Sequence, residues 1–122
     1  MRIPLLLLSM LVWAPAHAQS YKKIHRKAIV VDTHNDFLMK AVDTHMVMDA
    51  DLSGKTHSDL ARWKKGGLDV QIFSVYCDGD AKAPFAYANR EMDSLDAVAA
   101  RSPDKIVKVF SYVEILQAVK QH

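Results

Sequence analysis

Cysteine, glycine and proline are scarce in this chain of 122 residues, which has one cysteine, four glycines and four prolines. The single cysteine, Cys77, excludes an internal disulfide framework, and we expect it to be a small, half-buried residue near the end of a strand. The sequence contains no internal repeat and no low-complexity linker. Half of the residues are apolar, which argues against intrinsic disorder.

The chain also lacks a strong excess of charge of either sign. Lysine and arginine total 16 against 14 aspartates and glutamates, and the two signs are mixed along the chain. The densest basic group, residues 22–27, reads as a solvated leader before the first strand. Nucleic-acid binding would need a clustered basic face, so we expect no nucleic-acid partner.

The longest apolar run is confined to the N-terminus and is too short to cross a bilayer, which needs about 20 residues. Arg2 precedes the apolar stretch 3–14, and Ala16-His17-Ala18 fits the small-x-small cleavage pattern of a secretory signal peptide. We therefore predict a signal peptide at residues 1–18 and one small domain at 19–122, with no membrane span after cleavage. The expected location is periplasmic or secreted, in a bacterium, and a retained N-terminal anchor helix is the alternative.

Strand and helix signals alternate after the leader. Apolar runs predict strands at 28–31 and 68–76, and residues 106–110 predict a third strand or an extended segment. Helices are expected at 37–43 and from Ser58 to about Lys65, with Gly66-Gly67 ending the second. Another is expected from Pro84 to about Arg101, with an apolar face of Phe85, Ala88, Met92, Leu95 and Ala99. The capping box Ser111/Glu114 opens a last helix, which we expect to bury Ile115, Leu116 and Val119. This βαβαβα order predicts an α/β fold with a parallel sheet. Three such strands alone would leave exposed sheet edges.

An imidazole and a carboxylate two positions apart follow the first predicted strand. His34 and Asp36 stand where the run 28–31 ends, in the segment AIVVDTHND. Catalytic groups of parallel α/β barrels lie at the carboxyl ends of strands, and histidine nitrogen and aspartate oxygen are both zinc ligands. His34 and Asp36 are therefore candidate metal ligands. We expect neighbouring Asp32 to be a capping or supporting group, and Asn35 either to orient a ligand or to form a turn.

The H-x-D spacing alone is a weak signal, because 6 histidines and 14 acidic residues produce roughly one such match by chance. The chain contains its own control in His57-Ser58-Asp59, which has the same spacing at the start of a predicted helix. There we expect Ser58 or Asp59 to cap the helix, and we do not expect His57 to bind metal.

Two ordered blocks resemble the membrane dipeptidase (renal dipeptidase) family of zinc peptidases. The first is VVDTHNDFL, and the second is THSDLARWKKGGLDVQIFSVYCD, with its HSDL, KKGG and FSVY segments. The resemblance implies an amidohydrolase-like (β/α)8 barrel with two zinc ions, a dipeptide substrate, often with a D-residue at its C-terminal position, and a possible homodimer in the full-length family. It implies that His34 and Asp36 hold one zinc ion and that hydrolysis is metal-assisted.

In the family, the bridging glutamate, the two histidines of the second zinc and a later aspartate would lie beyond His122. We therefore expect an incomplete barrel resembling about the first third of a family member, with at most one partial zinc site and no activity on its own, since a catalytic zinc normally keeps three protein ligands. Two alternatives stay open. One is a non-catalytic remnant or binding fragment of this fold, and the other is a different amidohydrolase-like metal hydrolase.

Overall fold

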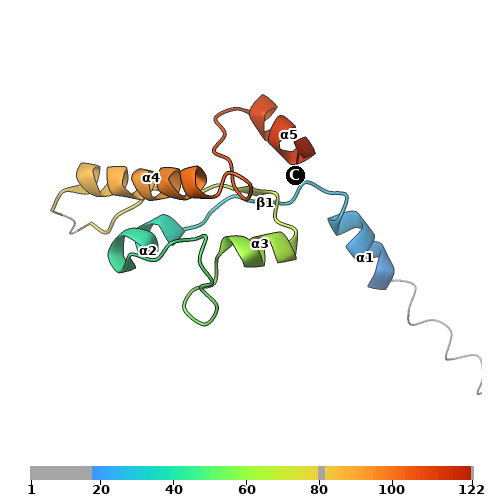
Figure 1. Cartoon of the computed structure of the whole chain (residues 1–122), viewed down its shortest axis with the longest axis horizontal. Coiled ribbons are helices and arrows are strands. Elements are labelled where there is room, and N and C mark those ends of the chain that lie inside the picture. The colour runs from blue at the N-terminus through green and yellow to red at the C-terminus, as the bar shows by residue number, and fades with distance from the viewer. Residues whose placement is uncertain (1–17, 80–81, 122) are drawn as a thin grey trace, which may run out of the picture.

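The computed structural model describes residues 18–79 and 82–121, and these residues form five helices and two short strands (Figure 1). They are α1 (Ala18–His25), β1 (Val31–Asp32), α2 (Phe37–Thr44), α3 (Leu60–Gly66), β2 (Val70–Gln71), α4 (Pro84–Arg101) and α5 (Tyr112–Gln121). Figure 1 shows α4 alongside α2, with α3 and α5 on opposite sides of β1 and α1 at one end of the molecule. The predicted signal peptide lies almost wholly outside the described residues.

The sheet consists of two parallel strands, with Val31 paired to Val70 and Asp32 to Gln71. The mixture of helices with a parallel strand pair is compatible with the predicted α/β fold, and the barrel stays a prediction. Both strands are shorter than their apolar runs predicted. Of the two alternatives predicted at 106–110, the strand does not form among the described residues, since that segment pairs with neither β1 nor β2. Strand propensity does not make a strand without a neighbour that takes up its backbone hydrogen bonds.

The core lies between α2, α4 and the loop that follows α2. Its buried apolar residues are Phe37, Leu38, Ala41, Met48, Leu52, Leu60 and Val98. Leu38, in the helix predicted at 37–43, is only 1% exposed. This packing fixes the first turn of α2, and therefore the direction in which the chain leaves β1.

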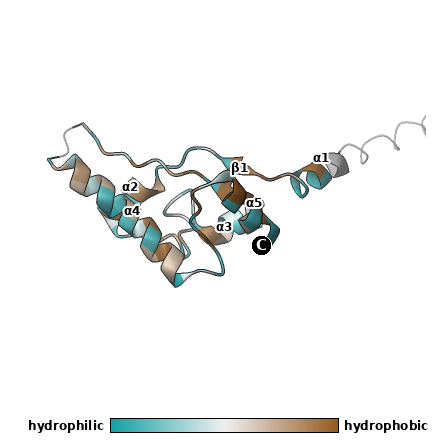
Figure 2. Cartoon of the chain, turned by 90° about the horizontal axis from the view of Figure 1, so that it is seen from above, coloured by the Kyte–Doolittle hydropathy of each residue, from teal (hydrophilic) through white to brown (hydrophobic). Residues whose placement is uncertain are grey.

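The apolar face predicted for α4 is partly wrong. Phe85 is 82% exposed and Met92 is 40% exposed, whereas the carboxylate residue Glu91 is completely buried and Val98 is 4% exposed. Figure 2 shows apolar and polar residues alternating around α4. The buried stripe of α4 is therefore rotated from the predicted one. It accommodates the Glu91 carboxylate because this group accepts the backbone N–H of Tyr76, in the segment after β2.

The ends of α3 follow ordinary capping chemistry. Asp59, and not Ser58, is the N-cap, and its carboxylate accepts the backbone N–H of Arg62 at 2.8 Å. Gly67 ends the helix in the left-handed region with φ of 72°, a conformation that glycine adopts without a steric penalty. The helix predicted from Ser58 to Lys65 is thus confirmed with a shift of one or two residues.

The last helix opens on the predicted Ser/Glu pair. The hydroxyl of Ser111 accepts the N–H of Glu114 at 3.3 Å, while the Glu114 carboxylate accepts the N–H of Phe110 at 2.5 Å. The apolar face of α5 is only half-buried, and none of its residues is buried, so the predicted burial of that face is wrong.

The basic leader forms the helix α1, whose side chains are exposed from Tyr21 onward. The ring nitrogen Nε2 of His25 lies 2.8 Å from the carbonyl oxygen of Gly66 at the end of α3. This contact links α1 to the end of α3. Within residues 18–79 and 82–121, no helix combines the length and the apolar character needed to span a membrane.

Candidate metal centre

The two candidate ligands lie in the loop between β1 and α2. Asp36 occupies the N-cap position of α2, yet its side chain makes no capping hydrogen bond. The neighbouring residue takes over that role, since Oδ1 of Asn35 accepts the N–H of Phe37 at 2.9 Å. An aspartate at an N-cap would ordinarily accept such a bond itself. The Asp36 carboxylate is therefore free to point elsewhere.

The side chains of His34 and Asp36 face each other. Nε2 of His34 lies 3.2 Å from Oδ1 of Asp36, and the two side chains are 71% and 52% exposed. Two ligands of one tetrahedral zinc ion, each about 2.1 Å from the metal, have donor atoms roughly 3.4 Å apart. Both the donor types and their separation thus fit two adjacent ligand positions of one zinc ion.

Backbone and side-chain hydrogen bonds fix the loop that carries this pair. Asp32 accepts the N–H of His34 on its Oδ1 at 3.0 Å, so it supports the loop locally, as an Asx turn does, and caps no helix. The Asn35 amide donates to the Ser58 hydroxyl and to Oε1 of Gln71, both at 3.2 Å. Asn35 therefore forms a turn, which is one of its two predicted roles, and it also joins the loop to β2 and to the segment before α3. Its role in orienting a ligand stays a prediction.

A third side chain reaches the pair from the second strand segment. The hydroxyl of Ser74 hydrogen-bonds to Oδ1 of Asp36, the same oxygen that faces His34. The residue-by-residue interpretation of the sequence missed Ser74. The only signal for it was its place in the FSVY segment, since nothing in a lone serine after a strand indicates a supporting role.

The control motif behaves as a helix cap. The Asp59 carboxylate is 1% exposed and accepts hydrogen bonds from Arg62 and Leu52, while His57 is exposed. Spacing alone therefore does not distinguish the two H-x-D motifs, whereas their positions in the fold do. Across the part of the chain that the structure describes, no cluster of three or more histidine, cysteine, aspartate or glutamate side chains is placed to hold a metal.

The buried carboxylate of Glu91 contacts the segment that follows β2, at Tyr76. Its Oε2 accepts the N–H of Tyr76 at 2.8 Å, and its buried Oε1 has no hydrogen-bond partner. Burial raises the pKa of Glu91, the N–H of Tyr76 lowers it in part, and the negative charges of Asp43 and Asp36 raise it further. Glu91 thus supports the strand end and experiences the charge of the candidate ligand Asp36.

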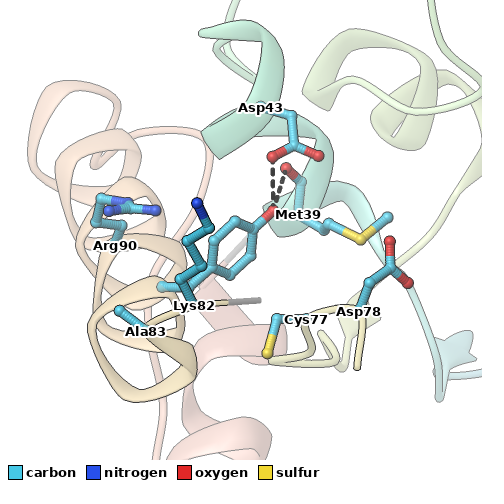
Figure 3. A pocket seen from close by; sticks show the side chains of 8 residues that line it. Met39, Asp43, Cys77, Asp78, Lys82, Ala83 and Arg90 are labelled. Atoms are coloured by element: carbon cyan, nitrogen blue, oxygen red, sulfur yellow. Dashed lines mark hydrogen bonds between the residues drawn. The ribbon is translucent and has the colours of Figure 1, made fainter. Parts of the chain in front are cut away.

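A cavity of about 350 Å³ opens between α2, α4 and the loop after β2 (Figure 3). Tyr87 lines it, and its hydroxyl donates to Oδ1 of Asp43 at 2.8 Å. Burial makes the larger contribution and this hydrogen bond a smaller one, and together they raise the pKa of Tyr87 to about 12. Cys77 is half-buried at the cavity wall, as predicted. His34 and Asp36 do not line this cavity, so it is separate from the candidate metal pair.

The chain was compared with models of known protein families. One of them, described as membrane dipeptidase (peptidase family M19), matches residues 18–122. The match spans every described element from α1 to α5.

Proposed function

This chain belongs to the membrane dipeptidase family, peptidase family M19, and on that premise we propose that it serves the zinc-dependent hydrolysis of dipeptides. Peptidase chemistry follows from the family. The metal, its ligands in this chain and the dipeptide preference belong to the proposal. The expected barrel, homodimer and export also belong to it.

We assign zinc to Nε2 of His34 and Oδ1 of Asp36. When bound, zinc lowers the pKa of a water molecule and polarises a carbonyl group. The contribution of this chain is geometric, because the hydrogen bond from the His34 N–H to Asp32 and the contacts of Asn35 hold the loop in place. The exposure of the pair leaves room for further ligands and for substrate.

The observation that carries the proposal is the unused N-cap carboxylate. Asp36 stands at the start of α2 without capping it, and it points instead at His34, 3.2 Å away. A capping aspartate would have been the ordinary outcome, and the second H-x-D motif shows that outcome at Asp59. The different behaviour of the two motifs in one chain supports a metal-binding role for the first.

Exposed apolar residues of the two strand segments support a larger covered sheet. Val31 is 47% exposed, Ile72 is 51% exposed and Val75 is 45% exposed. Strands of parallel sheets are normally covered on both faces. We therefore propose that this sheet is part of the family's barrel, whose remaining ligands complete a two-zinc site.

Zinc titration of the 122-residue chain tests the ligand assignment. We expect one zinc ion to bind weakly and to shift the imidazole NMR signals of His34, because two protein ligands are fewer than a catalytic zinc normally keeps. H34A and D36N should abolish this binding. The matched control H57A removes the histidine of the other H-x-D motif and should leave it unchanged. Zinc binding that survives both H34A and D36N would overturn the assignment.

Dipeptide hydrolysis tests the activity itself. The 122 residues alone should not hydrolyse dipeptides. Joined to a chain that supplies the family's remaining metal ligands, they should hydrolyse dipeptides, should lose this activity on chelation and should regain it with added zinc. The same variants apply, with H57A again as the control. Activity of the joined protein that is insensitive to H34A would contradict the proposed function.

A further inference from the structure

Ser74 holds an unusual position relative to the β1–β2 ladder. The N–H of Val70 donates to the carbonyl oxygen of Val30 at 3.0 Å, and the N–H of Ile72 donates to that of Asp32 at 2.8 Å. A regular parallel ladder would next join Ser74 to residue 34. Instead the N–H of Ser74 donates to the carbonyl oxygen of Asn35 at 3.1 Å. The segment that continues β1 therefore contains one extra residue at this point.

This extra residue has the character of a β-bulge, which redirects side chains at the end of a strand. It places residue 36 opposite Ser74, and the Ser74 hydroxyl meets the Asp36 carboxylate there. The hydroxyl also lies 3.4 Å from the carbonyl oxygen of Asn35. A serine has only one hydroxyl proton to donate, and the carboxylate is the stronger acceptor of the two.

The Asp36 side chain needs such a partner. It is 52% exposed and does not cap its helix, and its other partner, His34, is itself 71% exposed, so without Ser74 it would exchange more freely among staggered rotamers. The Ser74 contact selects the rotamer in which Oδ1 faces Nε2 of His34. Outer hydrogen bonds of this kind orient the side chains that bind metals.

We propose that Ser74 is a positioning residue that holds the Asp36 carboxylate towards His34 before any metal arrives. The proposal rests on the assignment of zinc to His34 and Asp36, and it adds a residue that acts through Asp36 without touching the metal. Removing the hydroxyl should raise the zinc dissociation constant by about tenfold, at the lower end of the effect of such supporting groups.

The first test needs no metal. Three-bond couplings that report χ1 of Asp36 are measured by NMR on the metal-free 122-residue chain. The wild type should show one dominant rotamer, and S74A should show averaged couplings. S74C should resemble S74A, because a thiol is a weak donor, and S74T should keep the wild-type values. The exposed Ser53 supplies the control S53A. Asp36 couplings unchanged in both S74A and S74C would overturn the proposal.

The second test separates the role of Ser74 from the proposed function. Zinc titrations followed at His34 should show the tenfold weakening in S74A and S74C but not in S74T or S53A. An unchanged dissociation constant in both S74A and S74C, with the wild type binding zinc through His34, overturns the role of Ser74 and leaves the proposed function standing. Averaged Asp36 couplings in S74A, with no zinc binding to the wild type, support the positioning contact and overturn the metal assignment.

Discussion

Replacing Asp59 by alanine should destabilise the chain more than the loss of a simple helix cap would. The carboxylate is 1% exposed and accepts three kinds of donor. These are the N–H of Arg62 at 2.8 Å, the Arg62 guanidinium at 2.7 Å and the N–H of the buried Leu52 at 3.2 Å. Loss of the cap costs about 1 kcal/mol, and each donor left unpaired costs about 1 kcal/mol more.

The free energy of unfolding should therefore fall by about 3 kcal/mol in D59A, a large share of the 5–15 kcal/mol typical of a folded domain. Urea denaturation followed by circular dichroism at 222 nm measures this change. D93A is the matched control, because Asp93 is exposed on α4 and its loss should change stability by less than about 0.5 kcal/mol. A D59A variant within 0.5 kcal/mol of the wild type would refute the reasoning.

The same residue predicts a pH dependence. Burial by itself raises the pKa of Asp59, but the hydrogen bonds from Arg62 and Leu52 outweigh it and leave the pKa below its usual value. Stability contributed by a carboxyl with a lowered pKa is present above the unfolded-state pKa and is lost as the pH falls through the folded-state pKa. The difference in unfolding free energy between wild type and D59A should therefore shrink below about pH 4. A constant difference down to pH 2 would contradict this explanation.

Three further changes have expected outcomes, each measured by urea denaturation. L38A empties a buried position, 1% exposed, and should lower the free energy of unfolding by about 2–5 kcal/mol. F85A, at an exposed position, should lower it by less than about 0.5 kcal/mol. Similar losses of stability in the two variants would refute the assigned core. G67A and G54A both place a side chain at positive φ, and each should lower the free energy of unfolding by about 1–2 kcal/mol. G67A should cost more, because its Cβ would lie 3.0 Å from Nε2 of His25, whereas no atom lies within 4 Å at Gly54. Equal costs would show that the His25 contact is unimportant. The pKa of Glu91 is raised, so its stabilising contribution is complete below its unfolded-state pKa and is lost as the pH rises through its folded-state pKa. E91Q should therefore gain stability relative to wild type between about pH 4 and pH 7. A constant difference in unfolding free energy between the two proteins would exclude this titration.

Local chemistry made an end of α3, of α4 and of α5 predictable from the sequence, whereas α1, in the stretch expected to be a solvated leader, was not predicted. Pro84 begins α4, Gly67 ends α3 and the Ser111/Glu114 pair opens α5, because each of these residues acts within its own turn of backbone. The lengths of the strands were not predictable in this way. A strand depends on a partner far along the chain, so the apolar run 106–110 has strand character without becoming a strand.

The candidate site was predicted in part for the same reason. His34 and Asp36 were identified from their place after an apolar run, and the structure brings their side chains together. Ser74 and Glu91 were missed because their roles depend on the register between distant segments. The extra residue opposite Ser74 has no signature in composition or periodicity, and a buried Glu91 contradicts the pattern expected of a helix core.

The parallel pairing of β1 and β2 has a consequence for the order in which the chain folds. Asp32 and Gln71 are 39 positions apart, and the segment between them contains α2 and α3. Closing such a long loop is slow compared with forming the helices inside it, because the entropy of closure is lost before the distant contacts are gained. Ser74 reaches Asp36 only when this closure is complete. The candidate metal centre should thus be among the last parts of the chain to form, and a bound ion would slow unfolding more than it would speed folding.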